Sequence, residues 1–208
     1  MAKRPNIFLV VLDTVIYDHM SCYGYFRETT PNIDVVASRG VVFENAFSNA
    51  PWTPESHGAL FTGLYPSANG VYGENLYLSP DNITLAEILS KEGYCTLGIG
   101  DPMVSVAHGF AKGFYNFIEP WRSSKLSGIL RNLRNLPRYL VGKEKFHFKN
   151  ELIIRWLEYS YDDSKPFFIY ANYDDAHQPY TPPHPFRERF EVTIDDSLDL
   201  SKLRDLAD

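Results

Sequence analysis

The chain has 208 residues, of which 44% are hydrophobic, 15% aromatic and 22% charged. This composition is typical of a globular protein with one sizeable core, and it excludes a chain that is disordered throughout. Twenty Lys and Arg residues against 26 Asp and Glu residues give a formal net charge of -6. Such a charge excludes a broad basic surface for nucleic acid, so a charged small-molecule substrate would need a local basic or metal-bearing site.

Cysteine usage and the N-terminus bear on the cellular compartment. Cys22 and Cys95 are the only cysteines, which indicates buried free thiols rather than a zinc cluster or a disulfide framework. The apolar run of residues 7–12 is too short for a signal peptide or a membrane span. We therefore expect a cytoplasmic protein that does not contact a membrane.

Apolar runs alternate with segments of helical periodicity along the chain. Residues 7–12 form a continuous apolar run that predicts a strand buried on both faces, with Asp13 at its C-terminal end. Further strands are predicted over residues 41–47, 94–99 and 167–172, and helices over residues 30–38, 56–62, 84–92 and 148–159. This order predicts an α/β fold, a mainly parallel sheet with helices on both faces.

Two segments differ in composition from this alternating pattern. Residues 121–149 are basic with weak periodicity, which predicts a helical insertion at the surface, either a solvated face or lid, or a surface that touches membranes or nucleic acid. Residues 191–208 form a polar, acidic tail or the start of a missing segment. We expect a single compact unit before this tail.

Several polar residues follow predicted strands or lie in loops that return to the same edge. In open α/β sheets, ligands bind outside the carboxyl ends of the strands. Asp13, Thr53, Asp101 and His177 are therefore expected to converge there. A dinucleotide-binding fold is excluded at its first turn, because residues 13–18 lack the Gly-rich sequence that would cradle a pyrophosphate.

An ordered set of motifs with consistent spacing runs from residue 4 to residue 186. It resembles the opening of the sulfatase family of the alkaline phosphatase superfamily, and its pieces are residues 4–13, 18–24, 30–34, 40–47, 56–66, 84–89 and 176–183. The resemblance implies that residues 1–190 are the N-terminal part of a sulfatase-like catalytic domain, truncated at the C-terminus. It also implies metal-dependent hydrolysis of sulfate or phosphate esters through a covalent intermediate, with a small anionic ester as the substrate.

The resemblance assigns roles to individual residues. By position, Asp13 matches a metal ligand, Thr53 matches the metal-bound nucleophile, and His177 resembles a histidine that contacts the ester group. Thr14 stands where many members have a second metal-binding Asp, and its hydroxyl would be a weaker ligand. The implied cofactor is a divalent metal, calcium, or zinc or manganese if the protein is phosphodiesterase-like.

Thr53 departs from the usual Cys or Ser that most sulfatases oxidise to formylglycine. Its β-carbon carries a methyl group, so the same oxidation cannot give an aldehyde, and no formylglycine is expected. Threonine is the nucleophile in related phosphodiesterases and phosphonate hydrolases, which favours phosphoryl esters. The alternative is that Thr53 only caps the following helix.

Two further departures remove positive charge from the expected anion pocket. His57 replaces an Arg and would be either a ligand-facing base or a packed polar residue. Asp101 stands where a Lys often contacts the sulfate, and would be either a structural residue or an acid near the substrate. His57 and Asp101 are both candidate substrate-binding residues.

The family's downstream metal pair, carried in a Gly-Asp-His-Gly type motif, does not occur in this sequence. One carboxylate and threonine hydroxyls are too few ligands for a tightly held divalent ion. Two hypotheses follow: a hydrolase whose remaining ligands lie outside this sequence, or a catalytically inactive sulfatase-like module or fragment that binds an anion or a partner. The isolated chain is expected to turn over esters poorly, and its oligomeric state stays open.

Overall fold

The computed structural model describes residues 4–122, 148–178, 180, 182 and 186–189. Their core is a four-stranded, wholly parallel sheet in the order β1 (Ile7–Leu12), β4 (Phe167–Tyr173), β2 (Cys95–Ile99) and β3 (Asn116–Ile118). Three of these strands confirm the predicted positions to within a residue at each end. The expectation that residues 7–12 are buried on both faces is wrong, because β1 lies at the edge of the described sheet and has one half-exposed face. The three-residue strand β3 was not predicted, because it is too short to show a periodic pattern.

The position of each strand in the sheet accounts for its burial. Strand β4 lies between β1 and β2, and its residues from Phe167 to Asn172 are all buried. Strand β1 lies at one edge of the described sheet, where Phe8 and Val10 are each 52% exposed. The pairing of Leu12 with Tyr173 brings the carboxyl ends of β1 and β4 to the same level, and this level positions the site described below.

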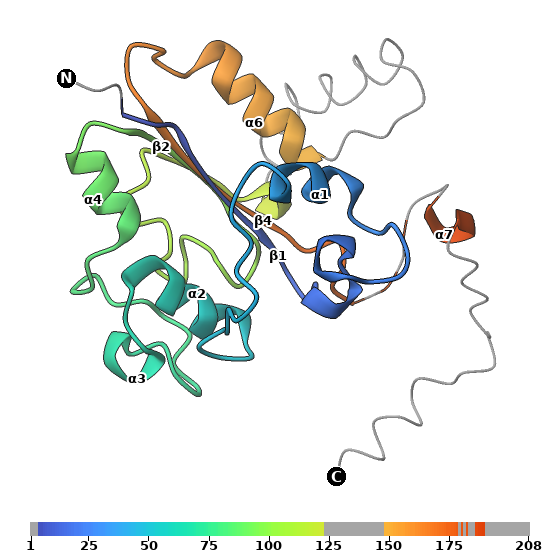
Figure 1. The fold of residues 1–208 in the computed structure, drawn as a ribbon. Coiled ribbons are helices and arrows are strands. Elements are labelled where there is room, and N and C mark those ends of the chain that lie inside the picture. The colour runs from blue at the N-terminus through green and yellow to red at the C-terminus, as the bar shows by residue number, and fades with distance from the viewer. Residues whose placement is uncertain (1–3, 123–147, 179, 181, 183–185, 190–208) are drawn as a thin grey trace.

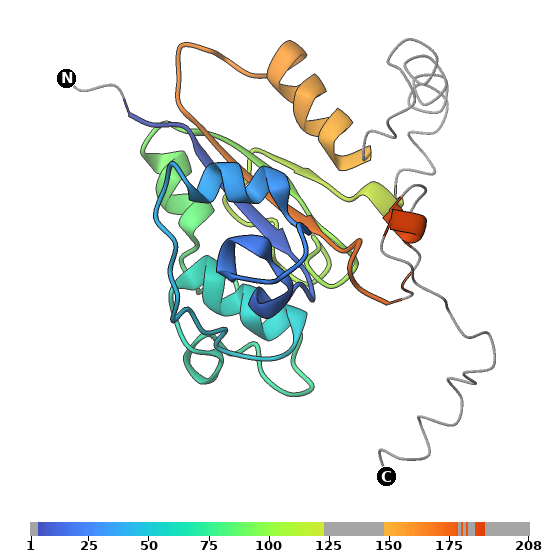
Figure 2. The same cartoon turned by 45° about the vertical axis from the view of Figure 1, so that its right-hand side comes forward.

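The helices cover both faces of the sheet (Figures 1 and 2). Helix α6 (Phe148–Tyr159) packs Leu152 and Trp156 against one face, whereas α2 (Thr53–Thr62) and α4 (Leu85–Lys91) lie on the other. This arrangement confirms the predicted α/β class. The remaining helical elements are α1 (Pro31–Ala37), α3 (Pro66–Asn69), α7 (Phe186–Arg189), and the 3-10 turns η1 (Tyr17–His19), η2 (Ser21–Tyr23) and η3 (Pro120–Arg122).

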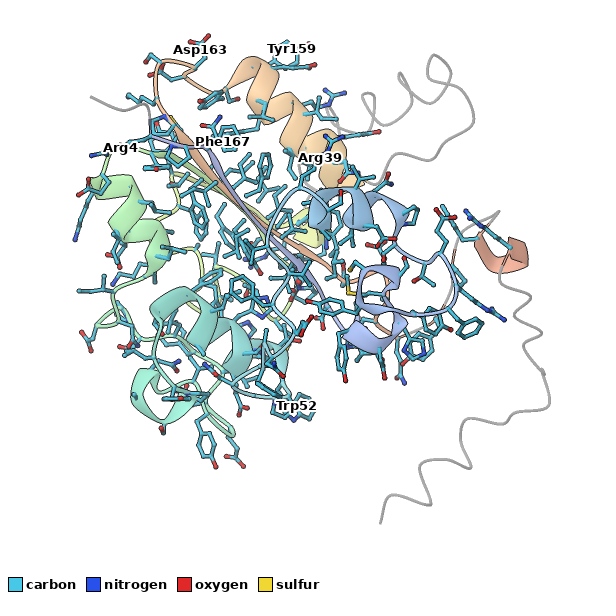
Figure 3. All side chains as sticks on the ribbon, viewed as in Figure 1. Arg4, Arg39, Trp52, Tyr159, Asp163 and Phe167 are labelled. Carbon is cyan, nitrogen blue, oxygen red and sulfur yellow. The ribbon has the colours of Figure 1, made fainter. Side chains whose placement is uncertain are left out.

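Helix α4 shows how local sequence sets the helix ends. The Thr84 hydroxyl accepts a hydrogen bond from the backbone of Glu87, whose carboxylate accepts one from the backbone N–H of Thr84, a complete capping box. Gly93 follows the helix with a φ of +84°, a conformation that glycine adopts without steric cost. Arg4 pairs with Glu92 at 2.9 Å at this end of the molecule (Figure 3).

The strand predicted over residues 41–47 is wrong. These residues form turns and irregular backbone, and Val41, Phe43 and Phe47 are 78%, 70% and 85% exposed. A strand needs a neighbouring strand that forms hydrogen bonds with its backbone and a core that covers its side chains. Among the described residues, this segment has no neighbouring strand, and its apolar side chains are exposed. Apolar and β-branched residues alone were therefore an insufficient signal.

Other predictions fall partly or wholly outside the described residues. Most of the expected insertion, residues 123–147, and the tail of residues 191–208 lie outside the described residues.

Cys22 and Cys95 are free, and both are partly rather than fully buried. Among the described residues, no helix is both long enough and apolar enough to span a bilayer.

Candidate active site

Asp13 is the first residue after β1, at the carboxyl edge of the sheet. Its backbone N–H donates a hydrogen bond of 2.8 Å to the carbonyl of Tyr173, the last residue of β4, so its position is fixed by the sheet. Thr14 follows with a φ of +62°, and among the described residues it is the one non-glycine residue with a positive φ. A β-branched residue in this region is strained, and such strain clusters at functional sites.

Thr53 is the first residue of α2, and it meets Asp13 across 40 positions of sequence. Its hydroxyl donates a hydrogen bond of 3.2 Å to the Asp13 carboxylate, and both side chains are partly buried. Trp52 rather than Thr53 is the N-cap residue, and its side chain makes no cap hydrogen bond. Trp52 instead projects at the surface, 69% exposed, away from Arg4 and Phe167 at the other end of the sheet (Figure 3).

The alternative that Thr53 serves only as a helix cap is therefore not what the structure shows. Helix α2 has Pro54 as its second residue, and Gly63, whose φ is +70°, follows its last residue. Proline at this position fits because the first backbone N–H groups of a helix have no intrahelical partner. The free N–H groups at this end and the helix dipole favour an anion next to Thr53.

His57 lies one turn further along α2 and is 3% exposed. Its Nδ1 lies 2.8 Å from the carbonyl oxygen of Thr53, and because a carbonyl can only accept, Nδ1 carries the hydrogen. Burial lowers the pKa of His57 below its ordinary value, while the bond to Thr53 and the carboxylates of Asp101 and Asp13 oppose that shift. This burial favours the packed polar role over the ligand-facing one.

Asp101 follows β2 and is 5% exposed. One carboxylate oxygen accepts hydrogen bonds from the backbone N–H groups of Met103, at 2.7 Å, and Val104, at 3.0 Å. The other accepts a hydrogen bond from the side-chain amide of Asn172. Asp101 therefore holds the loop after β2 in place. Of the two roles that the sequence left open, a structural residue or an acid near the substrate, these contacts fit the first.

Tyr170 and Asn172 of β4 complete this buried polar group, and sequence reasoning missed both. Each is fully buried, and burial raises the pKa of the Tyr170 phenol well above its ordinary value, with the carboxylates of Asp101 and Asp13 adding to the shift. Within the described part of the chain, the Tyr170 hydroxyl, the Asn172 side-chain oxygen and His57 Nε2 have no hydrogen-bond partner. The one sequence signal was a Tyr and an Asn within an otherwise apolar strand.

His177 lies in the loop that follows β4, at the same edge as Asp13. Its side chain is exposed, its backbone N–H donates to the carbonyl of Asp174, and its Nδ1 lies 3.0 Å from the carbonyl oxygen of Gln178. The buried Lys149 of α6 holds the start of this loop, since its ammonium donates to the carbonyl of Asn172 at 2.6 Å and to the Asp174 carboxylate at 2.5 Å. The loop is thus anchored beside β4, and the described hydrogen bonds of His177 stay within it.

The donors at the edge suit one class of metal ion. Asp13, Thr14 and Thr53 offer only oxygen atoms, which hard cations such as calcium and magnesium prefer over nitrogen and sulfur. Among the described residues, no group of three or more His, Cys, Asp or Glu side chains is placed to hold an ion. These oxygen donors fit part of a coordination shell, and further ligands would have to come from water or from residues outside the described ranges.

A parallel sheet covered by helices on both faces, with a threonine at a helix N-terminus facing a carboxylate at the strand ends, defines an α/β protein with a polar site at the carboxyl edge of its sheet. A family model described as Sulfatase matches residues 5–201. The chain belongs to the sulfatase family.

The individual relatives agree with this assignment. The uncharacterized sulfatase YidJ of Escherichia coli (strain K12) is 25% identical over 207 residues, which cover 90% of this chain and 41% of YidJ. Human arylsulfatase A is 34% identical over 113 residues, which cover 48% of this chain and 22% of that enzyme. This chain thus spans less than half the length of these curated relatives.

Solved structures share the fold. The BT4656 protein in complex with D-glucosamine-2-N,6-O-disulfate matches with a TM-score of 0.69 and 24% identity, covering 92% of this chain and 38% of that one. Phosphonate monoester hydrolase of Agrobacterium radiobacter matches with a TM-score of 0.68 and 22% identity, covering 89% of this chain and 44% of that one. At these identities the matches establish a common fold.

Proposed function

We propose that this chain supplies the nucleophile-bearing part of a divalent-metal-dependent hydrolase of sulfate or phosphate esters. The observation that carries the proposal is the hydrogen bond of 3.2 Å from the Thr53 hydroxyl to the Asp13 carboxylate. It joins the end of β1 to the start of α2, 40 residues apart, and by motif order the two residues match the nucleophile and a metal ligand of the sulfatase family. Asp13, Thr14 and Thr53 would hold the metal.

The reaction divides into two displacements. In the first, Thr53 Oγ1 forms a bond to the sulfur or phosphorus atom while the bond from that atom to the leaving alcohol's oxygen breaks. The Thr53 proton passes to the Asp13 carboxylate, to which the hydroxyl already donates, and His177 gives the leaving alcohol its proton. In the second step His177 takes a proton from the attacking water, whose oxygen bonds to the sulfur or phosphorus atom, and the departing threonine oxygen regains its proton from Asp13. A bound divalent ion would promote ionisation of the threonine hydroxyl and neutralise charge on the ester oxygens.

Thr53 acts in this proposal as an unmodified side chain. Its methyl group prevents the oxidation that gives formylglycine, and the free N–H groups at the start of α2 favour an anionic ester beside it. Since threonine attacks phosphorus directly in related phosphodiesterases, we favour a phosphate or phosphonate ester over a sulfate ester. An inactive anion-binding module is the competing function.

Turnover of an aryl phosphodiester and an aryl sulfate tests the proposal on this chain and on the chain extended by whatever follows residue 208 in its gene. We expect turnover in the extended form with calcium or manganese, loss of turnover in Thr53→Val, and partial retention in Thr53→Ser. Thr62→Val is the matched control, because it makes the same change at the other end of α2, where the Thr62 hydroxyl donates to the carbonyl of Gly58. Wild-type turnover by Thr53→Val would remove Thr53 from the mechanism.

A further inference from the structure

Three buried polar atoms gather on the face of the sheet that α2 covers. His57 Nε2, the Tyr170 hydroxyl and Asn172 Oδ1 have no hydrogen-bond partner among the described residues, and their side chains are 3%, 0% and 0% exposed. Buried polar atoms in folded proteins nearly always have a partner, since leaving one unpaired costs its full desolvation. Three such atoms in one region therefore call for a common partner.

The contacts place the three side chains in one region of the core. Tyr170 and Asn172 are two residues apart in β4, so their side chains leave the same face of the sheet. The ring of His57 meets the ring of Tyr170 edge-on, with 6.0 Å between centroids. Asn172 donates to Asp101, whose carboxylate acts electrostatically on both His57 and Tyr170.

The hydrogen-bond inventory defines what fits there. Nδ1 of His57 carries its hydrogen toward the Thr53 carbonyl, so Nε2 is a free acceptor. The Asn172 amide nitrogen donates to Asp101, so Oδ1 is a second free acceptor, and the Tyr170 hydroxyl can donate. A water molecule gives two hydrogen bonds and receives one or two, which matches this set. An anion would face two acceptors and the Asp101 carboxylate.

We propose that one buried water links Tyr170, His57 and Asn172, and that this network positions Thr53 through its backbone carbonyl. The water fixes the ring of His57, and His57 in turn holds the carbonyl of Thr53 and the first turn of α2. Tyr170 and His57 are then positioning residues that act on the nucleophile through its backbone. The water site stands by itself, whereas its catalytic consequence rests on the proposed function.

A crystal structure of the full chain at a resolution that shows ordered water tests the site directly. We expect one water within about 3.2 Å of all three atoms. A metal ion there, a side chain from outside the described residues, or a direct hydrogen bond between Tyr170 and His57 would each overturn the proposal. This measurement uses the unaltered protein, so it does not depend on whether a variant folds.

Tyr170→Phe tests the positioning role, with Tyr173→Phe as the matched control. Tyr173 lies on the opposite face of β4, and its hydroxyl bonds to Asn150 at 2.5 Å, so both variants lose one phenol from one strand. We expect Tyr170→Phe to lower kcat by about tenfold to a hundredfold with KM unchanged, as for other residues that orient a reacting group. The nitrogen NMR signals of His57 should shift in Tyr170→Phe and stay unchanged in Tyr173→Phe.

Unchanged kcat and unchanged His57 signals in Tyr170→Phe would refute the network. The proposed function fails separately, through an active Thr53→Val, and that result leaves the water site and the NMR shift intact. The two proposals are therefore distinguishable.

Discussion

Thr14 offers a quantitative test of the carboxyl edge, because its backbone is strained where a metal ligand is expected. Its φ of +62° puts a β-branched residue in the left-handed region, at a cost of roughly 1–2 kcal/mol. Glycine removes this strain but adds flexibility to the unfolded chain, at a cost of about 0.5–1 kcal/mol. The side chain is exposed, so little packing is lost, and Thr14→Gly should raise the free energy of unfolding by about 0.5–1 kcal/mol.

Thr14→Asp separates the strain from the proposed metal role. Aspartate tolerates the left-handed region better than threonine, but it places a second carboxylate beside Asp13. Without a divalent ion, the repulsion between these carboxylates should offset the relief of strain, so Thr14→Asp should be less stable than Thr14→Gly. With calcium, the added charged ligand should tighten binding by about tenfold or more, about 1.4 kcal/mol.

Urea unfolding with and without calcium, together with calorimetry, measures both effects. Val15→Gly is the control, since Val15 is the β-branched neighbour and its φ is not positive, so glycine there should only destabilise. A loss of stability in Thr14→Gly as large as that in Val15→Gly would refute the strain argument. Unchanged calcium affinity in Thr14→Asp would place Thr14 outside the metal site.

Three further outcomes follow from the described contacts. His177→Ala should lower turnover of the extended chain by at least about tenfold, because the leaving alcohol loses its acid, and unchanged steady-state kinetics would contradict that role. Thr84→Val keeps the side-chain shape but removes the cap of Glu87 and the bond to the Lys112 carbonyl, so urea unfolding should show a loss of about 1–2 kcal/mol, and none if the cap contributes nothing. The hydrogen bond from Ser21 lowers the pKa of Asp34. This carboxyl therefore contributes stability at pH values above its pKa in the unfolded chain, and the contribution is lost as the pH falls through its pKa in the folded chain. NMR titration should show a higher pKa of Asp34 in Ser21→Ala, and an equal pKa would be inconsistent with that cause.

The part of the fold that the sequence predicted is the part with strong local signals. The apolar run of β1 forms the predicted strand, although at the edge of the described sheet. Thr84 and Gly93 set the ends of α4 through chemistry that depends on neighbouring residues alone. Residues 41–47 show the limit of such signals. Their apolar character fits a strand, but whether a neighbouring strand pairs with them depends on distant parts of the chain.

The site, too, contains residues that the sequence predicted and residues that only the structure reveals. Asp13 and Thr53 were expected at the same edge because parallel strands end together and motif order matched a family, and the structure brings the two side chains together. For His57, the sequence left open a ligand-facing base or a packed polar residue, and its burial in the structure favours the second. Tyr170 and Asn172 lie in a run that reads as core strand, and sequence alone does not say which face of β4 meets α2.

Peptide mass analysis measures whether Thr53 is an unmodified nucleophile. The extended chain would be incubated with a slow phosphoester and divalent metal, quenched in acid and digested. The proposed role of Thr53 predicts an unoxidised Thr53 peptide before incubation and one added phosphoryl group on Thr53 afterwards, absent in Thr53→Val. Oxidation at Thr53, or the same phosphoryl group on Ser56 or on another residue, would contradict it.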